Sequence, residues 1–295
     1  MIGCGDVALR AAQMMRGKAR VIGVVRRTEE VARLRGHGVV PIVADLDDHT
    51  SLRRLALAPF AVLHCAPPPS EGRDDPRTQR LVAALASARI IPQRLVYIST
   101  SGVYGDCAGA RVMETRPRKP QTPRARRRAA AEDRLRKWSA RNGVTLAILR
   151  APGIYSEARL PLDRLKQGTP ALAPEDDVFI NHIHADDLAR AAVAAIFRGG
   201  PNRAYNVSDD AQMKMGAWFD TVADAFHLPR PPRVSWDEAE SRIAPMLLSF
   251  MSESRRLVNA RAKRELRLRL AHPTPDALLA QVAPRELRKQ LALQL

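Results

Sequence analysis

Leu95–Asp106 reads LVYISTSGVYGD, an apolar run followed by a cluster of hydroxyl side chains and a turn. The apolar run predicts a buried strand that begins at Arg94 and ends at Ile98. Similar short β-branched runs alternate with amphipathic stretches through the first half of the chain, which is the pattern of βαβ units around a parallel sheet. The sequence therefore predicts an α/β fold.

The predicted elements follow this alternation. Strands are expected at Arg20–Val25, Val39–Ala44, Ala61–His64, Arg94–Ile98 and Thr145–Leu149. Apolar residues spaced three and four apart predict helices. These are expected at Ala8–Arg16, Glu29–Arg35, Arg77–Ala88, Arg124–Arg141 and Ala185–Phe197. Pro67–Asp75 is expected to be a loop, and helical spacing dominates the Arg- and Leu-rich C-terminal end.

A glycine-rich turn stands at the start of the chain, where Gly3–Ala8 reads G-x-G-x-x-A. Further motifs follow it in order: Val103-Tyr104-Gly105, Arg150–Tyr155, Asn181–Ala189 and Tyr205–Asp209. Together they resemble the extended short-chain dehydrogenase/reductase family, whose members include nucleotide-sugar epimerases and dehydratases. The resemblance covers Gly3 to about Asp209, and the chain is identified as an atypical member of this NAD-dependent epimerase/dehydratase-like family.

The resemblance implies a Rossmann-type doubly wound parallel sheet with a small, mostly helical C-terminal lobe. The expected NAD(P)-binding domain covers residues 1–155, and residues 156–295 form a mixed region with late sheet elements at about 178–208 and a substrate lobe. Only Met1 and Ile2 precede the glycine turn, where this fold has a whole strand. Loss of that central strand would open the hydrogen-bond ladder and expose apolar side chains. We therefore expect a mis-set start codon, with about five to eight strand residues encoded upstream.

The glycine turn predicts a dinucleotide site, because small residues let the backbone approach a pyrophosphate at the start of the next helix. Arg26 and Arg27 end the second strand, where an arginine would accept the extra phosphate of NADP and an acidic residue would bind NAD. NADP is the expected cofactor and NAD the alternative; otherwise the two arginines are solvated. The turn contributes Gly3, Cys4, Gly5, Asp6 and Val7, and the resemblance adds Asp45 and Leu46 at the adenine, then Cys65, Ala66, Pro67, Pro152, Gly153 and Ile154.

The catalytic region keeps one expected residue and lacks two. Counting three residues back from Val103 places the family's catalytic hydroxyl at Thr100. With Glu132 at the family's acidic position, its tyrosine and lysine fall on Arg124 and Arg128. A phenol of pKa about 10 can exchange a proton near neutrality when cations stabilise the phenolate, whereas a guanidinium of pKa above roughly 12 cannot. The usual acid is therefore missing.

The main hypothesis is an NADP(H)-dependent oxidoreductase or epimerase-like enzyme that acts on a small carbonyl or alcohol. Thr100 would position the reacting oxygen, and an unidentified acid would supply the proton. Arg124 and Arg128 share one helix face, and they either clamp an anionic group of the substrate or belong to a solvated charged run. The alternative hypothesis is a non-catalytic NADP(H)-binding sensor or interaction protein.

The net charge of +17 raises nucleic acid as a third hypothesis, which we discount. Aromatic residues make up 4% of the chain and do not interleave with the arginines, so stacking platforms for bases are absent. No apolar run reaches the roughly 18 residues of a membrane span, and no signal peptide is evident. We expect a cytoplasmic protein with a small-molecule substrate and neither a nucleic-acid nor a membrane partner.

Three kinds of residue that often form sites are interpreted as structural. The three cysteines lack metal-site or disulfide spacing and are expected to act as small apolar residues. His64 is a reserve proton donor, but a histidine at a strand end is more often structural. Asp186 and Asp187 fall at a helix start, where carboxylates act as caps, so no metal site is expected.

Overall fold

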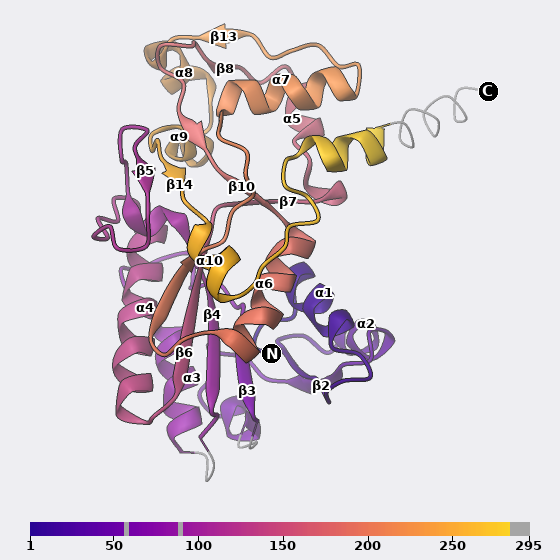
Figure 1. Cartoon of the computed structure of the whole chain (residues 1–295), viewed down its shortest axis with the longest axis vertical. Helices are drawn as coiled ribbons and strands as arrows, with labels where there is room; N and C mark the ends of the chain where they lie inside the picture. The colour runs from indigo at the N-terminus through magenta and orange to yellow at the C-terminus, as the bar shows by residue number, and fades with distance from the viewer. Residues whose placement is uncertain (56–58, 88–90, 284–295) are drawn as a thin grey trace, which may run out of the picture.

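The computed structural model describes residues 1–55, 59–87 and 91–283. Its core is a sheet of four strands in the order β11-β6-β4-β3 (Figure 1). These strands are β3 (Ala61–His64), β4 (Arg94–Thr100), β6 (Thr145–Ala151) and β11 (Arg203–Asn206). Each runs parallel to its neighbours, so the predicted α/β fold is confirmed.

A second parallel pair continues the sheet beyond β3. Its strands are β1 (Ile22–Val25) and β2 (Val40–Val43). This pair reaches β3 through one residue, Ile2, which forms parallel bridges to both Val24 and His64. A cavity of about 600 Å³ with mostly apolar walls lies between β1 and β3 beside Met1. The hydrogen-bond ladder between β1 and β3 is therefore limited to the bonds of Ile2 and its two neighbours, Met1 and Gly3.

Helices cover both faces of the sheet. On one face α1 (Asp6–Met14) packs against α6 (Ala185–Arg198), and on the other α3 (Pro76–Ala86) packs against α4 (Pro123–Arg141). The remaining helix, α2 (Glu30–Gly36), packs on β1 and β2. This is the doubly wound Rossmann arrangement that the sequence predicts. Ala88, the predicted end of α3, lies outside the described residues.

Smaller elements build a lobe beyond the carboxyl ends of the sheet strands (Figure 1). Its helices are α5 (Leu162–Lys166), α7 (Met215–Ala225), α8 (Trp236–Arg242), α9 (Pro245–Met251) and a helix over residues 276–283. Its strands are β8 (Ala171–Leu172), β9 (Phe179–Ile180), β12 (Met213–Lys214) and β13 (Arg233–Val234). The lobe therefore combines its helices with strand pairs that have no periodic sequence signal.

Two strand pairs and a helix connect the lobe to the sheet. The pairs are β7 (Gly153–Tyr155) with β10 (His182–His184), and β5 (Arg111–Val112) with β14 (Arg256–Leu257); the helix is α10 (Ala260–Glu265). The described residues also form three short 3-10 segments, η1 (Ser51–Leu55), η2 (Ser101–Tyr104) and η3 (Glu157–Arg159). The sequence predicts mainly helix after Asn206, and the described residues there are mainly helical, with three two-residue strands, β12, β13 and β14, between the helices. Two residues are too few to show the alternation that identifies a strand.

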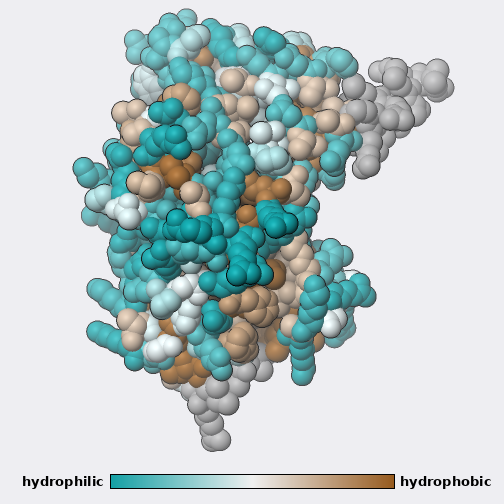
Figure 2. Space-filling model, in the orientation of Figure 1, coloured by the Kyte–Doolittle hydropathy of each residue, from teal (hydrophilic) through white to brown (hydrophobic). Residues whose placement is uncertain are grey.

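The surface is mostly hydrophilic, as expected for an arginine-rich chain. Hydrophilic side chains cover most of the face shown in Figure 2. In the part of the chain that the structure describes, no helix is long and apolar enough to cross a membrane. The boundary between residues 1–155 and 156–295 stays a prediction.

Candidate functional site

The glycine turn borders a cavity of about 450 Å³. Gly3 has a φ of +80°, and a Cβ there would lie 2.7 Å from the backbone nitrogen of Ala66, so only glycine fits. A Cβ on Gly5 would meet nothing within 4 Å, so this side of the turn is open. Helix α1 begins at Asp6 without a side-chain cap, and its first N–H groups have no partner within the helix. The turn therefore fits the pyrophosphate of a dinucleotide.

This cavity, the cofactor cavity, brings together most of the predicted cofactor residues. It is lined by Gly3, Cys4, Gly5, Asp6, Val7, Arg26, Arg27, Asp45, Leu46, Cys65, Ala66, Pro67 and Ile154. Pro152 and Gly153 instead line a neighbouring cavity. They stand where the chain passes from β6 to β7 and so turns from the sheet toward the lobe.

Basic side chains gather where the extra phosphate of NADP is expected. Arg26 and Arg27 are exposed just beyond β1, and Arg27 forms a 3.4 Å ion pair with Glu30. Arg33 also lines the cavity and donates to the carbonyl oxygen of Cys4 at 3.1 Å. Sequence reasoning missed Arg33, because nothing local distinguishes it from Arg35, the other arginine of α2.

Asp6 and Cys65 also line the cofactor cavity, and their surroundings limit the negative charge that each would present to an anionic cofactor. Asp6 would repel a phosphate, but its carboxylate accepts a 2.7 Å hydrogen bond from Arg10. Burial raises the pKa of Cys65 to about 12, so its thiol stays protonated and adds no charge.

The neighbouring cavity has a volume of about 510 Å³ and lies between the sheet and the lobe. We call it the reactive cavity. It shares Ile98, Arg128 and Ile154 with the cofactor cavity, so the two spaces meet. Thr100, the last residue of β4, lines the reactive cavity, and its Oγ1 accepts the N–H of Gly102 at 3.2 Å. The hydroxyl proton of Thr100 is therefore still available to a ligand oxygen.

Arg124 and Arg128 both line the reactive cavity, as their shared helix face predicts. Arg128 donates to the Tyr97 hydroxyl at 3.0 Å and to the carbonyl oxygen of Ile98 at 2.8 Å. The guanidinium carbon of Arg124 lies 4.0 Å from the ring centroid of Phe250. Within residues 1–55, 59–87 and 91–283, neither arginine forms an ion pair with a carboxylate. Both therefore remain able to bind an anionic group.

No tyrosine is found among the described residues that line the reactive cavity. Tyr97 is fully buried, and burial raises its pKa to about 12. Tyr104, from the family tripeptide, donates to the Asn206 side-chain oxygen at 2.7 Å and accepts from Arg150 at 2.9 Å. Both phenols bond to groups in the protein interior, so neither is placed to act as an acid in the reactive cavity.

Four charged or titratable residues that sequence reasoning missed also line the reactive cavity: Arg164, His182, Glu253 and Arg255. The rings of His182 and Trp218 lie 4.6 Å apart between centroids. Burial lowers the pKa of His182 to about 4, so its imidazole is neutral at neutral pH. His182 stands in a quoted motif and could have been selected; the other three come from segments that resemble no motif.

His64, the reserve proton donor, is a core residue. Its Nε2 atom lies 2.9 Å from the Thr78 hydroxyl oxygen, and burial lowers its pKa to about 3. It lines neither of the two cavities. This geometry favours the structural interpretation over proton donation.

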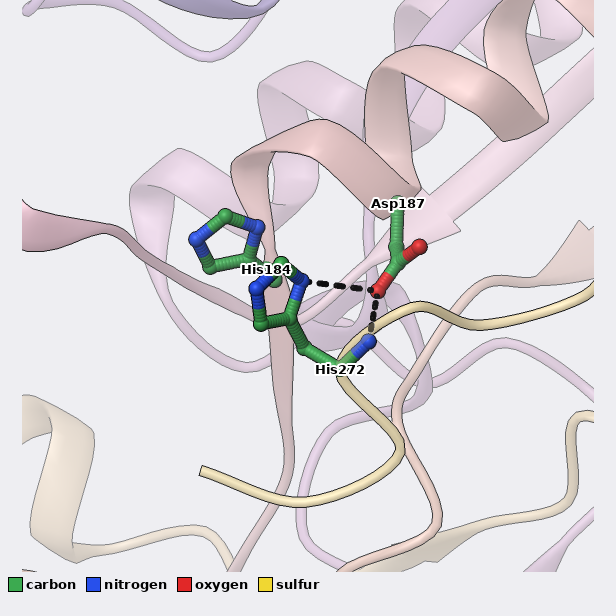
Figure 3. A group of neighbouring side chains, drawn as sticks. All are labelled: His184, Asp187 and His272. Carbon is green, nitrogen blue, oxygen red and sulfur yellow. Dashed lines mark hydrogen bonds and ion pairs between the residues drawn. The ribbon is translucent and has the colours of Figure 1, made fainter. Parts of the chain in front are cut away.

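The paired aspartates of α6, Asp186 and Asp187, do not form the side-chain cap that the sequence analysis predicts. The cap is His184, whose Nδ1 accepts the N–H of Asp186 at 3.2 Å. Asp187 accepts the backbone N–H group of His272 at 2.9 Å (Figure 3). It also accepts the backbone N–H group of Ala271 at 2.8 Å. Asp187 therefore ties the C-terminal segment to α6, and its predicted capping bond is wrong.

His184, Asp187 and His272 place one possible ligand atom each within 4.8 Å of the others. The two imidazole rings lie against each other, with centroids 3.7 Å apart and planes inclined by 33° (Figure 3). The Asp187 carboxylate already accepts three N–H groups, one of them from Arg190. The cluster is better explained as a tether.

The doubly wound sheet and the glycine turn at its carboxyl edge define a Rossmann-type protein. Residues 8–208 match the model of the NAD dependent epimerase/dehydratase family, which is more than half of the chain. The chain belongs to this family, and the prediction of an extended short-chain dehydrogenase/reductase is confirmed.

Individual relatives are distant. A human dTDP-D-glucose 4,6-dehydratase is 25% identical over 146 residues, which cover 47% of this chain and 41% of that protein. The solved structure of a conserved protein of unknown function from Silicibacter pomeroyi is 29% identical, with a TM-score of 0.78 and coverage of 96% of this chain and 97% of the other. A nucleoside-diphosphate-sugar epimerase from Pseudomonas aeruginosa is 19% identical, with a TM-score of 0.78 and coverage of 97% and 96%. The match to the human enzyme spans less than half of its length.

Proposed function

We propose that this protein is an NADP(H)-dependent oxidoreductase or epimerase-like enzyme that acts on a small anionic carbonyl or alcohol substrate. The main support is that the cofactor and reactive cavities meet at Ile98, Arg128 and Ile154. A nicotinamide ring at this junction would face a ligand in the reactive cavity. Bound NADP(H) would supply or accept the hydride.

The residues of the cofactor cavity would hold the dinucleotide. Gly3 and Gly5 would let the pyrophosphate reach the N-terminus of α1. Arg26, Arg27 and Arg33 support NADP over NAD, because β1 is followed by two basic residues and not by an acidic one, and Arg33 of α2 lines the same cavity. Asp45 and Leu46 would contact the adenine.

On the reactive side, Thr100 would donate a hydrogen bond to the substrate oxygen. Arg124 and Arg128 would bind an anionic group of the substrate, since both guanidiniums lie against neutral partners. Neither arginine exchanges a proton at working pH, so the proton must come from another source.

A second candidate is an NADP(H)-binding sensor or interaction protein without turnover. The observation that favours it is the lining of the reactive cavity, which contains no tyrosine among the described residues. Consumption of NADPH against a panel of carbonyl compounds separates the two candidates, because the sensor would bind the coenzyme without oxidising it.

Parallel titrations with NADPH and NADH test the cofactor assignment. We expect NADPH to bind about tenfold more tightly, because its extra phosphate gains charge-assisted hydrogen bonds. Arg26→Ala should remove most of this preference, whereas Arg35→Ala, which alters an exposed arginine of α2, should not. Tighter binding of NADH would overturn the NADP assignment.

A further inference from the structure

A groove in which every second lining residue is an arginine lies along α6, separate from the cofactor and reactive cavities. Its volume is about 470 Å³, and none of its lining residues borders either of those cavities. We call it the arginine groove, and it is lined by Arg190, Ala194, Arg198, Arg267, Leu268, Arg269, Leu270 and Ala271. No carboxylate is among these described lining residues. The arginine groove therefore concentrates positive charge outside the proposed enzyme site.

The arginine groove has two walls. Arg190, Ala194 and Arg198 stand four residues apart on α6, so they share one helix face and span about 12 Å. The other wall is the segment 267–271, which follows α10 and runs beside α6 (Figure 1). An extended ligand in the groove can therefore contact arginines from two parts of the chain.

The second wall is tied to α6 at both ends. At one end, Arg198 donates to the carbonyl oxygen of Leu266 at 3.1 Å. At the other end, the N–H groups of Ala271 and His272 donate to the buried carboxylate of Asp187 at 2.8 and 2.9 Å. A ligand would not have to order this segment, so little binding free energy would be lost to ordering.

Little negative charge offsets the four arginines. Arg190 is the one that forms an ion pair within the described ranges, at 2.9 Å with Asp187. The side chains of Arg267 and Arg269 are exposed and form neither a hydrogen bond nor an ion pair with residues 1–55, 59–87 or 91–283. Arg198 is bound to a carbonyl oxygen and keeps further N–H donors. Three guanidiniums can therefore bind an anion.

The backbone at Arg267 adds an independent observation. Its φ is +54°, in the left-handed region that favours glycine. Arg267 stands one residue beyond Leu266, the C-cap of α10, at a position that glycine usually fills. An arginine costs stability there that a glycine would not. Such strain is typical of binding sites, and here it accompanies a guanidinium without a partner among the described residues.

The other lining residues indicate which kind of anion fits. No aromatic ring is among the described residues of the arginine groove, so nucleobases would have no stacking surface there. Aliphatic side chains lie between the arginines, from Ala194, Leu268, Leu270 and Ala271. Carboxylates form paired, charge-assisted hydrogen bonds with guanidiniums. An acidic peptide carries carboxylates and aliphatic side chains on one chain, so it matches both parts of this lining.

We propose that the arginine groove binds an acidic segment of a partner protein. Carboxylates of that segment would bind to Arg198, Arg267 and Arg269, and its aliphatic side chains would pack against Ala194 and Leu270. This interaction is independent of the proposed function, because NADP(H) and the substrate would bind in the other two cavities.

Calorimetric titration of the full chain at physiological ionic strength tests the proposal with four probes. The first is an octapeptide in which glutamate alternates with leucine, and the second has glutamine in place of glutamate. Octathymidylate and inorganic triphosphate present phosphates in place of carboxylates. We expect the acidic peptide to bind at least about tenfold more tightly than each of the other three. Equal or tighter binding of any of these three, or no binding of the acidic peptide, would overturn the proposal.

Two variants locate the contact. Arg269→Gln and Arg267→Gly should each weaken binding of the acidic peptide about tenfold. Arg267→Gly should do so without lowering the melting temperature, since glycine adopts the left-handed conformation without strain, and it remains a test if Arg269→Gln does not fold. The matched control is Arg141→Gln, which alters an exposed arginine of α4 and should leave the affinity unchanged. Equal affinities in Arg269→Gln and Arg141→Gln would contradict the assigned groove.

Discussion

The two cavities that meet at Arg128 differ in how closely their lining residues follow the pattern expected from the family. The cofactor cavity keeps the features that bind a dinucleotide: a glycine turn, an uncapped helix start and basic residues beyond β1. The reactive cavity contains Thr100 together with Arg124 and Arg128, which the sequence analysis predicts at the family's tyrosine and lysine positions. The two cavities depend on different residues, so cofactor binding and the chemistry beside it can be tested separately.

The largest expected effect is at the glycine turn. Gly3→Ala should weaken NADPH binding about a hundredfold, because the added Cβ would lie 2.7 Å from the nitrogen of Ala66. Gly17→Ala is a matched control: its φ of +75° imposes similar strain, but a Cβ there meets nothing within 4 Å. Dissociation constants and melting temperatures of both variants separate lost binding from lost stability. Equal losses of affinity would show that the turn does not form the cofactor site.

A tyrosine placed at position 124 tests whether the reactive cavity lacks only a group that can donate a proton. Arg124→Tyr should raise NADPH consumption with a carbonyl substrate by about tenfold or more, because general acid catalysis then becomes available next to the charge of Arg128. Arg124→Phe is the control that adds the ring without the hydroxyl. If both variants behave alike, the missing tyrosine does not limit turnover.

Removing one guanidinium should affect only the reactive side. Arg124→Met should weaken binding of an anionic substrate about tenfold and change NADPH affinity little, since Arg124 lines the reactive cavity alone. Arg126→Met, on an exposed position of the same helix, should change neither affinity. An unchanged affinity for the anion in Arg124→Met would show that this arginine is merely solvated.

The smallest expected effect concerns a carboxyl group behind the reactive cavity. Burial raises the pKa of Asp209 from 3.8 to about 8. Between about pH 4 and about pH 8 the unfolded chain therefore binds fewer protons at this site than the folded protein, so its contribution to stability falls as pH rises. Asp209→Asn cannot ionise and should melt several degrees above the unaltered protein near pH 8, with the gap closing near pH 4. A gap that does not depend on pH, or an equal effect of the exposed variant Asp237→Asn, would contradict this.

The sequence predicts the sheet and the cofactor cavity well because their signals are local. The first three residues of β3, Ala61–Leu63, are apolar, and Gly3 and Gly5 must be small wherever a backbone approaches a ligand. Strand and helix ends shifted by a few residues; β1 begins at Ile22, for example, and not at Arg20.

The reactive cavity is harder to predict because folding assembles it from distant segments. Arg164 and Glu253 belong to short lobe segments with no periodic pattern, and an arginine there resembles every other arginine in the chain. Asp187 was misread for the same reason: its partners, the N–H groups of Ala271 and His272, lie 84 and 85 residues away. Sequence spacing predicts contacts within a helix but not across the fold.

The most direct test is amide hydrogen exchange of the unaltered protein with and without NADPH. The first N–H groups of α1, from Asp6 to Ala8, lack partners within the helix and face the cofactor cavity. We predict that NADPH slows exchange there and in the segment from Cys65 to Pro67, with little change in α7. Unchanged exchange at the start of α1, or protection confined to the lobe, would contradict the placement of the cofactor on which this account depends.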